Sequence, residues 1–209
     1  LIYIEELIKS KANDDELAKV IAVSKTFPME NILPLIEHGH LHYGENKVQE
    51  ALDKWSDIKL KNNAIKLHLI GRLQTNKVKF ALRIFDYIHS LDSEKLAIKI
   101  SEEQKKQEKN TKIFIQVNIG NEDQKSGINK DNLVDFYKFC KNLNLDIIGT
   151  MCIPPNDGNT EKYFSEMSDI NKELNFKELS MGMSGDYLEA IRYNATYVRV
   201  GSKIFGSRS

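Results

Sequence analysis

Residues 20–37 read VIAVSKTFPMENILPLIE, and this stretch contains the first of eight similar units along the chain. Its apolar run at 20–24 has the length and composition of a buried strand, and residues 29–37 read as a helix. A strand that leads through a short loop into a helix is the building unit of a sheet with parallel strands. The fold therefore depends on how often this unit recurs.

Strand-like and helix-like runs alternate over the rest of the chain, with no linker rich in Pro, Gly or Ser between them. We expect strands at residues 20–24, 41–44, 66–70, 87–90, 112–118, 146–151, 178–181 and 197–200. We expect helices at residues 29–37, 47–54, 76–82, 93–107, 130–142, 160–174 and 185–193, and a short one from Ser202. Eight such units predict an α/β fold, a single (β/α)8 barrel of the TIM type, although 209 residues is close to the lower limit for that fold. A doubly wound open sheet is the alternative, and counting strands does not decide between the two.

The composition is that of an ordinary globular protein, with 41% hydrophobic and 29% charged residues, and we expect one domain over residues 1–209. The 30 basic residues balance 30 acidic ones, which argues against nucleic acid or an anionic membrane as a partner. No apolar stretch is long enough to cross a bilayer, and the amino end has acidic residues where a signal peptide has basic ones. Cys140 and Cys152 have neither a metal-ligand spacing nor a plausible disulfide framework, which predicts a reducing compartment, most simply the cytoplasm.

Lys25 follows the first apolar run directly. Ligands of a barrel bind at the carboxyl ends of its strands, so the residues after each run are the candidates for a site. A lysine held at the mouth of a buried strand is in a drier environment than a surface lysine, which favours its neutral amine and therefore a Schiff base with an aldehyde. The alternative is a strand-end lysine whose amine simply reaches solvent.

Two loops near the carboxyl end contain small residues that suit an anion. The segment GMSG at 182–185 and the pair Gly201 and Ser202 each lead into a helix, where backbone N–H groups and hydroxyls can approach a phosphate. The alternative is a pair of tight turns and helix caps. A lysine and a phosphate cradle on one rim indicate pyridoxal 5′-phosphate as the ligand. Arg199 beside the cradle would then face the pyridine nitrogen and keep it unprotonated, unless it forms a salt bridge under the last helix.

Seven parts of the chain, taken in order, resemble one known family. They are AVSK at 22–25, YGENKVQE at 43–50, HLIGRLQTNK at 68–77, IHSLD at 88–92, QVN at 116–118 with KSG at 125–127, LSMGMSGD at 179–186 and VRVGSKIFGSR at 198–208. These motifs resemble those of the pyridoxal phosphate homeostasis proteins, also called the YggS- or PROSC-like family. The resemblance implies a barrel similar to the amino-terminal domain of alanine racemase, with pyridoxal 5′-phosphate held as a Schiff base on the lysine of AVSK.

The same resemblance implies a set of cofactor-binding residues, namely Lys25, Asn46, Met151, Ser184, Arg199, Gly201 and Ser202. It implies that Asn46 lies beside the ring, that Met151 packs near it, and that Arg199 faces the pyridine nitrogen. It also implies that Ser184, Gly201 and Ser202 hold the phosphate. The family often has Thr where this chain has Ser202, and Ser keeps the hydroxyl.

Three further residues of the motifs are expected to lie outside the site. His68 is in the middle of the apolar run 67–70, so we expect a packed, hydrogen-bonded core histidine rather than a general base. The family often has an aromatic residue where this chain has Leu67, which leaves the packing of that strand open. Lys77 and Lys125 also recur in the motifs, and we expect solvated surface lysines.

Racemases of this fold need two acid/base groups, the Schiff-base lysine and a tyrosine from a second domain. The chain ends at Ser209, directly after the eighth unit, so we expect no second domain and a barrel mouth that leaves the cofactor wet. We therefore predict a monomer that stores, delivers or buffers pyridoxal 5′-phosphate for pyridoxal phosphate-dependent apo-enzymes, with no catalytic residue and no metal. One alternative is a weak amino-acid racemase that uses Lys25 with water or with Tyr43, Tyr163 or Tyr187. The other is a structural barrel without a cofactor.

Overall fold

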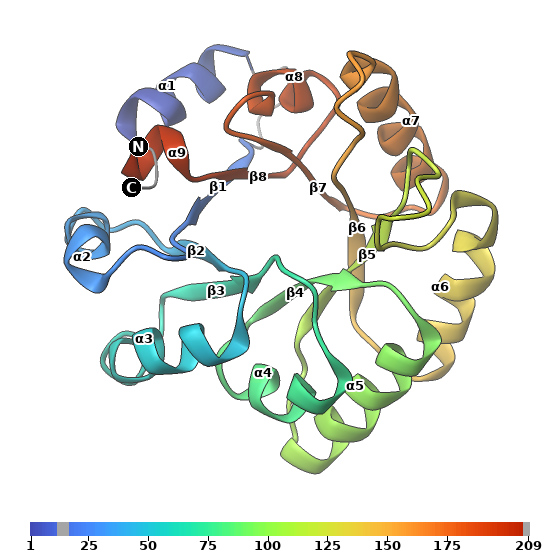
Figure 1. Cartoon of the computed structure of the whole chain (residues 1–209), viewed down its shortest axis with the longest axis horizontal. Coiled ribbons are helices and arrows are strands. Elements are labelled where there is room, and N and C mark those ends of the chain that lie inside the picture. Colours follow the sequence, from blue (N-terminus) through green and yellow to red (C-terminus); the bar gives the residue numbers. More distant parts are fainter. Residues whose placement is uncertain (12–16, 207–209) are drawn as a thin grey trace.

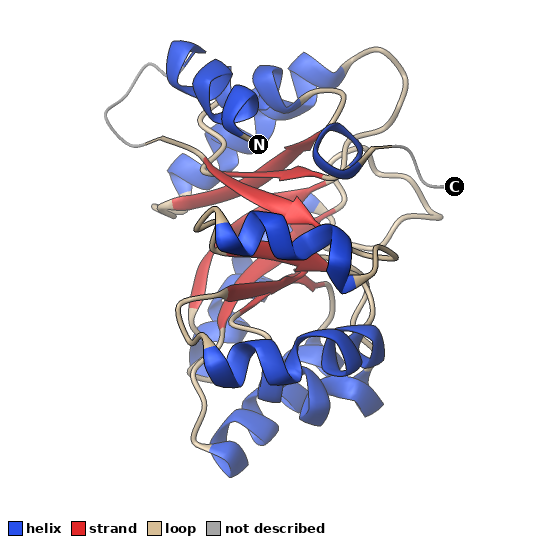
Figure 2. Ribbon diagram, turned by 90° about the vertical axis from the view of Figure 1, so that its left-hand side faces the viewer, coloured by secondary structure: helices blue, strands red, loops and turns tan. Residues whose placement is uncertain are grey.

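The structure is a computed structural model that describes residues 1–11 and 17–206. Within these residues the strands are parallel, each pairs with the next along the chain, and β8 pairs with β1 to close the sheet. Figure 1 shows the barrel end-on, and Figure 2 shows from the side that the helices cover its outer surface. The predicted (β/α)8 barrel is thus confirmed, and closure excludes the open sheet.

The secondary structure follows the order of the sequence. The strands are β1 (Lys19–Val23), β2 (His42–Glu45), β3 (Lys66–Leu69), β4 (Tyr87–Leu91), β5 (Lys112–Val117), β6 (Ile147–Cys152), β7 (Glu178–Met183) and β8 (Tyr197–Val200). The α-helices are α1 (Ile2–Lys11), α2 (Met29–Glu37), α3 (Val48–Lys61), α4 (Val78–Ile84), α5 (Glu94–Gln107), α6 (Leu133–Asn142), α7 (Thr160–Glu173), α8 (Tyr187–Arg192) and α9 (Ser202–Phe205). Short 3-10 helices, η1 (Thr75–Lys77) and η2 (Lys130–Asn132), precede α4 and α6.

Helix α3 is the element that differs most from its predicted bounds, because it continues to Lys61 rather than ending at residue 54. Ala51 and Trp55 are fully buried on one side of this helix, and the Trp55 ring lies 4.7 Å from that of Tyr43 on β2. This packing against the barrel favours continuation of the helix through the polar sequence that follows.

Alternate residues of β1 belong to two separate apolar cores. On β1, Val20 and Ala22 belong to the main apolar core, which the barrel shares with the surrounding helices. Ile21 belongs instead to an inner cluster with residues of β4, β5, β6 and β8, namely Tyr87, Phe114, Met151 and Tyr197. The inner cluster lies inside the barrel, because successive side chains of a strand point to opposite faces of the sheet.

Within the described part of the chain, no helix is both long enough and apolar enough to cross a membrane. Cys140 and Cys152 are free and buried, as the absence of a disulfide framework predicted. Burial raises the pKa of each thiol to about 12, so both remain protonated and unreactive at neutral pH.

Candidate cofactor site

A cavity of about 530 Å³ lies at the carboxyl ends of the barrel strands. It is lined by Val23, Lys25, Phe27, Asn46, Ile70, Ile153, Met183, Ser184, Gly185, Arg199, Gly201, Ser202 and Gly206. Six of the seven predicted cofactor-binding residues are in this lining, and only Met151 is not. The barrel therefore brings together residues from both ends of the sequence at the edge where barrels bind their ligands.

Lys25 lies between two residues that are held by acidic side chains. The Ser24 hydroxyl donates to Glu45 Oε1 at 2.7 Å, and the Thr26 N–H donates to Glu50 Oε1 at 2.6 Å. Thr26 has a φ of 67°, in the left-handed region that non-glycine residues rarely adopt. The chain around Lys25 is thus held in one strained conformation, which limits the directions its side chain can take.

Glu45 is the centre of this anchor. It has no exposed surface, and its Oε1 accepts hydrogen bonds from Ser24, from Lys54 Nζ at 2.9 Å and from Trp55 Nε1 at 2.9 Å. Lys54 also donates to the Ser24 carbonyl oxygen at 2.9 Å and to Glu50 at 3.1 Å. A buried carboxylate is tolerated when it is paired with a cation and hydrogen-bonded, as it is here.

Sequence reasoning missed this anchor. The signal available was a glutamate, Glu45, directly after the strand predicted at residues 41–44. Its partner Lys54 lies on α3, nine positions further along, and nothing in the sequence showed which face of that helix packs on the barrel.

Arg199 is on β8 and is 4% exposed. Its Nη1 donates to the carbonyl oxygen of Ser180 at 2.9 Å and to the Ser180 hydroxyl at 2.7 Å, and its Nη2 donates to the Cys152 carbonyl oxygen at 2.8 Å. These partners are neutral, and no described carboxylate forms a salt bridge with Arg199, so the alternative of an ion pair under the last helix is wrong. Burial lowers the pKa of the guanidinium from its usual value, although an arginine stays charged at neutral pH.

The two glycine-rich loops meet at one side of the cavity. The Gly201 N–H donates to the Ser184 hydroxyl at 3.1 Å, which joins the loop after β7 to the loop after β8. Asp186 closes the first loop, because its Oδ1 accepts from the Met183 N–H at 2.6 Å. Ser202 follows Gly201 and is exposed. Residues of both loops therefore line the same part of the cavity.

Gly201 also lets β8 continue close to β1, since a Cβ at this position would be 3.3 Å from Val23. The ring of Phe27, in the loop that follows Lys25, lies 5.0 Å from that of Phe205 on α9. These contacts tie the loop after β1 to the one after β8.

Asn46 follows β2 and is half-buried in the cavity wall. A Cβ on Gly71, which follows β3, would be 2.8 Å from the Asn46 Cα. Only glycine allows the loops after these two strands to approach so closely, and this approach fixes the backbone of Asn46.

Met151 lies below the cavity rather than in its wall. It is 1% exposed and packs in the inner cluster with Phe114 and Tyr197. Strand β6 extends to Cys152, one residue beyond its predicted end, and the next residue, Ile153, is the one that reaches the cavity.

His68 is fully buried, and its two ring nitrogens lie 2.9 Å from ring nitrogens of His42 and His89. His68 is therefore a hydrogen-bonded core histidine, as predicted, and it is not among the residues that line the cavity. Lys77 and Lys125 also lie outside the lining. Lys125 is not simply solvated, because it pairs with Glu122 and donates to the Pro154 carbonyl oxygen at 3.1 Å.

Lys25 and Arg199 are the ionisable side chains among the described residues that line the cavity, and the Arg199 guanidinium with no carboxylate beside it in the lining suits an anion. None of Tyr43, Tyr163 and Tyr187 belongs to the lining. Tyr43 donates to the His40 carbonyl oxygen, Tyr163 donates to Asp157, and Tyr187 is 1% exposed on α8. In the described residues no group of three or more His, Cys, Asp or Glu side chains is arranged to hold a metal ion.

Comparison with protein families gives one match that covers nearly the whole chain. The sequence model of the alanine racemase N-terminal domain family matches residues 6–209. Two curated relatives are the pyridoxal phosphate homeostasis proteins of Pasteurella multocida and Aquifex aeolicus. The first is 36% identical over 216 residues and the second 37% over 215, and each alignment covers 98% of this chain and 93% of the relative.

Solved structures give the same result. The structure of PipY from Synechococcus elongatus with PLP bound superposes with a TM-score of 0.86 at 31% identity, covering 97% of this chain and 100% of that one. The alanine racemase of Clostridium difficile shares the fold, with a TM-score of 0.74 at 13% identity, over 99% of this chain and 56% of the racemase.

Proposed function

The chain belongs to the alanine racemase N-terminal domain family and, within it, to the pyridoxal phosphate homeostasis proteins. We propose that Lys25 holds the cofactor of this family in the cavity at the barrel mouth. The function is binding of pyridoxal 5′-phosphate for intracellular homeostasis of that cofactor. One observation carries the residue assignment. A single cavity brings together a lysine, a buried guanidinium and a cradle of small polar residues.

The chemistry of this donor set fits pyridoxal 5′-phosphate. A volume of about 530 Å³ lies within the range of pockets that take small ligands. The cofactor has an aldehyde, a ring nitrogen and a phosphate, and the wall offers an amine, a guanidinium, and hydroxyls with backbone amides. Each chemical group of the cofactor thus has a partner of matching chemistry.

Lys25 tethers the cofactor. Its neutral Nζ adds to the aldehyde carbon, and one water leaves as the C=N bond forms, so no oxidant or reductant is needed. The anchor at Glu45 supports this role, because it fixes Ser24 on one side of Lys25 while Glu50 fixes Thr26 on the other. A tether with a restricted backbone loses little conformational freedom when the bond forms.

Arg199 presents donors to the pyridine nitrogen. A guanidinium has five N–H groups and no acceptor, and three hydrogen bonds to Ser180 and Cys152 fix its plane. A donor-only cation facing the ring nitrogen keeps that nitrogen unprotonated. The ring then withdraws electrons weakly, which disfavours transaminase-type chemistry.

Ser184, Gly201 and Ser202 hold the phosphate through hydroxyls and backbone amides, and Asn46 lies beside the ring. Met151 acts from beneath the site, where it packs against the aromatic residues of the inner cluster. The positive charge of Arg199 favours the phosphate dianion in the same cavity.

A carrier fits this site better than a catalyst. Racemisation needs a second acid/base group opposite the lysine, and the described lining offers only Arg199, which does not exchange its proton near neutral pH. The tyrosines that might have served, Tyr43 and Tyr187 among them, lie elsewhere. A weak racemase that uses water opposite Lys25 is the second candidate, because the cavity is open to solvent at the strand ends.

The test is an absorbance spectrum after incubation with pyridoxal 5′-phosphate, followed by borohydride reduction and mass spectrometry. We expect an imine band near the visible edge and a reduced adduct on the peptide that contains Lys25. Lys25→Ala removes both, whereas Lys77→Ala, at a lysine outside the cavity, retains both. An adduct at another lysine would show that the tether is assigned to the wrong residue. Deuterium exchange at Cα of an added amino acid, abolished by Lys25→Ala, would favour the racemase.

The same proposal includes partners and location. The chain acts as a monomer in the cytoplasm and passes its cofactor to pyridoxal phosphate-dependent apo-enzymes. The large exposed apolar side chains support a monomer, because those on helices are spread over α1, α2, α3, α4, α5 and α6 rather than gathered on one element. Light scattering coupled to size exclusion tests the monomer, and transfer of the imine chromophore to an added apo-enzyme tests delivery.

A further inference from the structure

A continuous line of hydrogen bonds runs through the interior of the barrel. His42 Nδ1 lies 2.9 Å from His68 Nε2, and His68 Nδ1 lies 2.9 Å from His89 Nε2. His89 Nδ1 lies 2.9 Å from the Ser180 hydroxyl, to which Arg199 Nη1 donates at 2.7 Å. We call these five residues the histidine chain. It connects the guanidinium in the cofactor cavity to His42 at the amino end of β2.

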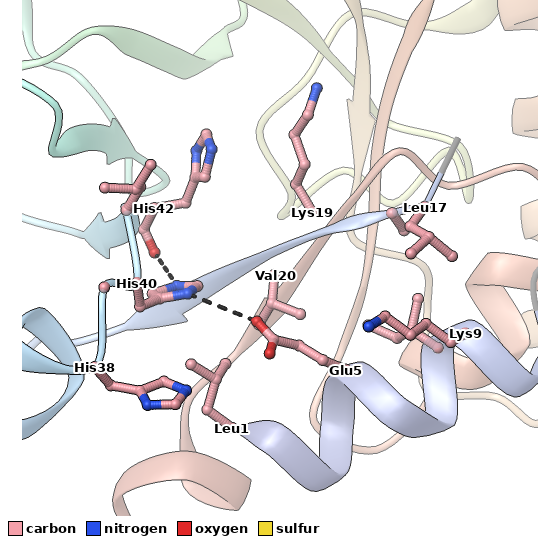
Figure 3. Close-up of a pocket in the computed structure, with 13 residues that line it drawn as sticks. Leu1, Glu5, Lys9, Leu17, Lys19, Val20, His38, His40 and His42 are labelled. Atoms are coloured by element: carbon pink, nitrogen blue, oxygen red, sulfur yellow. Dashed lines mark hydrogen bonds and ion pairs between the residues drawn. The ribbon is translucent and has the colours of Figure 1, made fainter. Parts of the chain in front are cut away.

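The lower end of the histidine chain lies at a second cavity of about 440 Å³ among the amino ends of the strands. Half-buried His42 lines this cavity together with Glu5 and His40. Figure 3 shows His40 between Glu5 and the backbone of His42. His40 Nε2 is 2.8 Å from the His42 carbonyl oxygen, and its Nδ1 is 3.9 Å from Glu5 Oε1. These contacts hold the strand that carries His42.

The rings of the histidine chain are fixed by aromatic stacking. His68 stacks on Tyr87 with centroids 4.2 Å apart and planes 9° apart, and His89 stacks on Phe114 at 4.2 Å and 22°. His68, His89 and Ser180 have no exposed surface. Rings held in this way cannot turn to find other partners, so each hydrogen bond needs a donor on one side and an acceptor on the other.

All three imidazoles are neutral at neutral pH. Burial lowers the pKa of His68 and of His89 well below the ordinary value, with further lowering of His68 by His89 and of His89 by Arg199. Burial, followed by the nearby His40 and Lys19, lowers the pKa of His42 to about 4. A neutral imidazole has one N–H donor and one acceptor nitrogen. The tautomer of one histidine therefore sets the tautomer of the next.

Arg199 sets the direction, because a guanidinium only donates. The Ser180 hydroxyl oxygen accepts from Arg199, and His89 Nδ1 is the acceptor in reach of the hydroxyl hydrogen among the described residues. If Nδ1 carried the proton instead, a buried O–H would be left unsatisfied, at a cost of about 1–3 kcal/mol. His89 then donates from Nε2 to His68, and His68 donates from Nε2 to His42.

We infer that Arg199 imposes the Nε2–H tautomer on His89, His68 and His42. These histidines and Ser180 are positioning residues that hold the guanidinium toward the cofactor. Through them, binding of the cofactor at Arg199 is coupled to His42 at the opposite end of the barrel. Retention of the cofactor at Arg199 rests on the proposed function. The tautomer order does not, because it follows from contacts within this chain.

The first test uses the protein without added cofactor and reads tautomers from the ¹⁵N resonances of its histidine rings at pH 7. We expect Nε2–H and unprotonated Nδ1 at His42, His68 and His89. Ser180→Ala removes the hydroxyl between Arg199 and His89 while keeping the guanidinium bonds to both carbonyl oxygens, and we expect mixed or reversed tautomers. Exposed His38, outside the histidine chain, is the internal control and keeps its resonances. Nδ1–H tautomers in the unmodified protein, or tautomers that Ser180→Ala leaves unchanged, would overturn the inference.

The second test adds pyridoxal 5′-phosphate. We expect loading, confirmed by absorbance, to shift the His42 ring resonances, and Ser180→Ala to abolish that shift while loading still occurs. Loading without a shift at His42 overturns the coupling. Absence of loading contradicts the proposed function instead, and the first test alone then decides the order of the tautomers in the histidine chain.

Two controls apply to both tests. Circular dichroism of Ser180→Ala confirms that this variant is folded. Cys152→Ala is the matched core variant, because it keeps the carbonyl contact with Arg199, and it should leave the tautomers unchanged.

Discussion

Acidification from pH 7 to pH 5 should strongly destabilise this protein, because its buried histidines cannot accept protons in the folded state. The pKa of His42 falls to about 4, and those of His68 and His89 lie well below the ordinary 6.5. In the unfolded chain all three titrate near 6.5. Between these values the unfolded state binds more protons than the folded state, so the free energy of unfolding falls as the pH falls through 6.5 and continues to fall toward the folded pKa.

The magnitude follows from linkage. A histidine with an unfolded pKa of about 6.5 that remains neutral when folded costs about 1.9 kcal/mol between pH 7 and pH 5. Three such residues cost about 6 kcal/mol, which is comparable to the whole stability of a typical domain. Carboxylates with lowered pKa, such as Glu50, act in a lower window, since their stabilisation is lost only as the pH falls below about 4.5.

The assay is urea unfolding followed by circular dichroism at pH 7, 6 and 5. His42→Gln keeps a polar side chain and should reduce the pH-dependent loss by about a third. His38→Gln is the matched control, because His38 is exposed, and it should leave the pH dependence unchanged. A loss of less than about 2 kcal/mol between pH 7 and pH 5 would refute the reasoning, since it would mean that the histidines are protonated inside the barrel.

Three further predictions concern the anchor, the barrel and the phosphate cradle. Glu45→Gln removes the buried partner of the Lys54 ammonium, which is 10% exposed, and should lower the free energy of unfolding by about 3 kcal/mol. Glu50→Gln changes a carboxylate that is 25% exposed and should cost less than about 1 kcal/mol. Equal losses for the two variants in urea unfolding would contradict this prediction. Gly149→Ala drives a methyl into the Glu178 carbonyl oxygen of the adjacent strand and should cost about 3 kcal/mol, while Gly185→Ala, whose methyl meets nothing within 4 Å, should stay within about 0.5 kcal/mol by the same measurement. Ser202→Ala should weaken retention of pyridoxal 5′-phosphate about tenfold and leave that of pyridoxal unchanged by dialysis and absorbance, and equal weakening of both would remove Ser202 from the phosphate cradle.

The fold was predictable because each strand and helix has a local signal. Apolar runs between polar loops gave strands whose ends lie within two residues of the observed ones. Closure of the sheet was not decided by any such run, since it depends on the pairing of β1 with β8. The end of α3 was missed because the burial of Trp55 against Tyr43 is a tertiary contact.

The site was predictable to the extent that it follows from strand ends. Lys25, Asn46, Ser184 and Gly201 come directly after strands or in the loops that follow them, and all line the cavity. Met151 shows the limit of that rule. Strand β6 ends one residue later than predicted, so the mouth of the barrel lies past Met151, and the alternation of side chains leaves Met151 inside the barrel. The anchor of Lys25 depended on which face of α3 packs inward, which local sequence does not specify.

The histidine chain was beyond local reasoning for a different reason, because it depends on the register of three strands. His42 pairs with Lys66 on β3, and His68 lies two residues further along that strand. His68 pairs in turn with Tyr87 on β4, and His89 again lies two residues further along. A step of two residues keeps each side chain on the inner face while moving it one layer toward the carboxyl ends. The three histidines therefore lie in successive layers of the barrel interior, in the direction of Arg199. A shift of one residue in either strand pairing would turn one imidazole out of the interior and interrupt the series of hydrogen bonds.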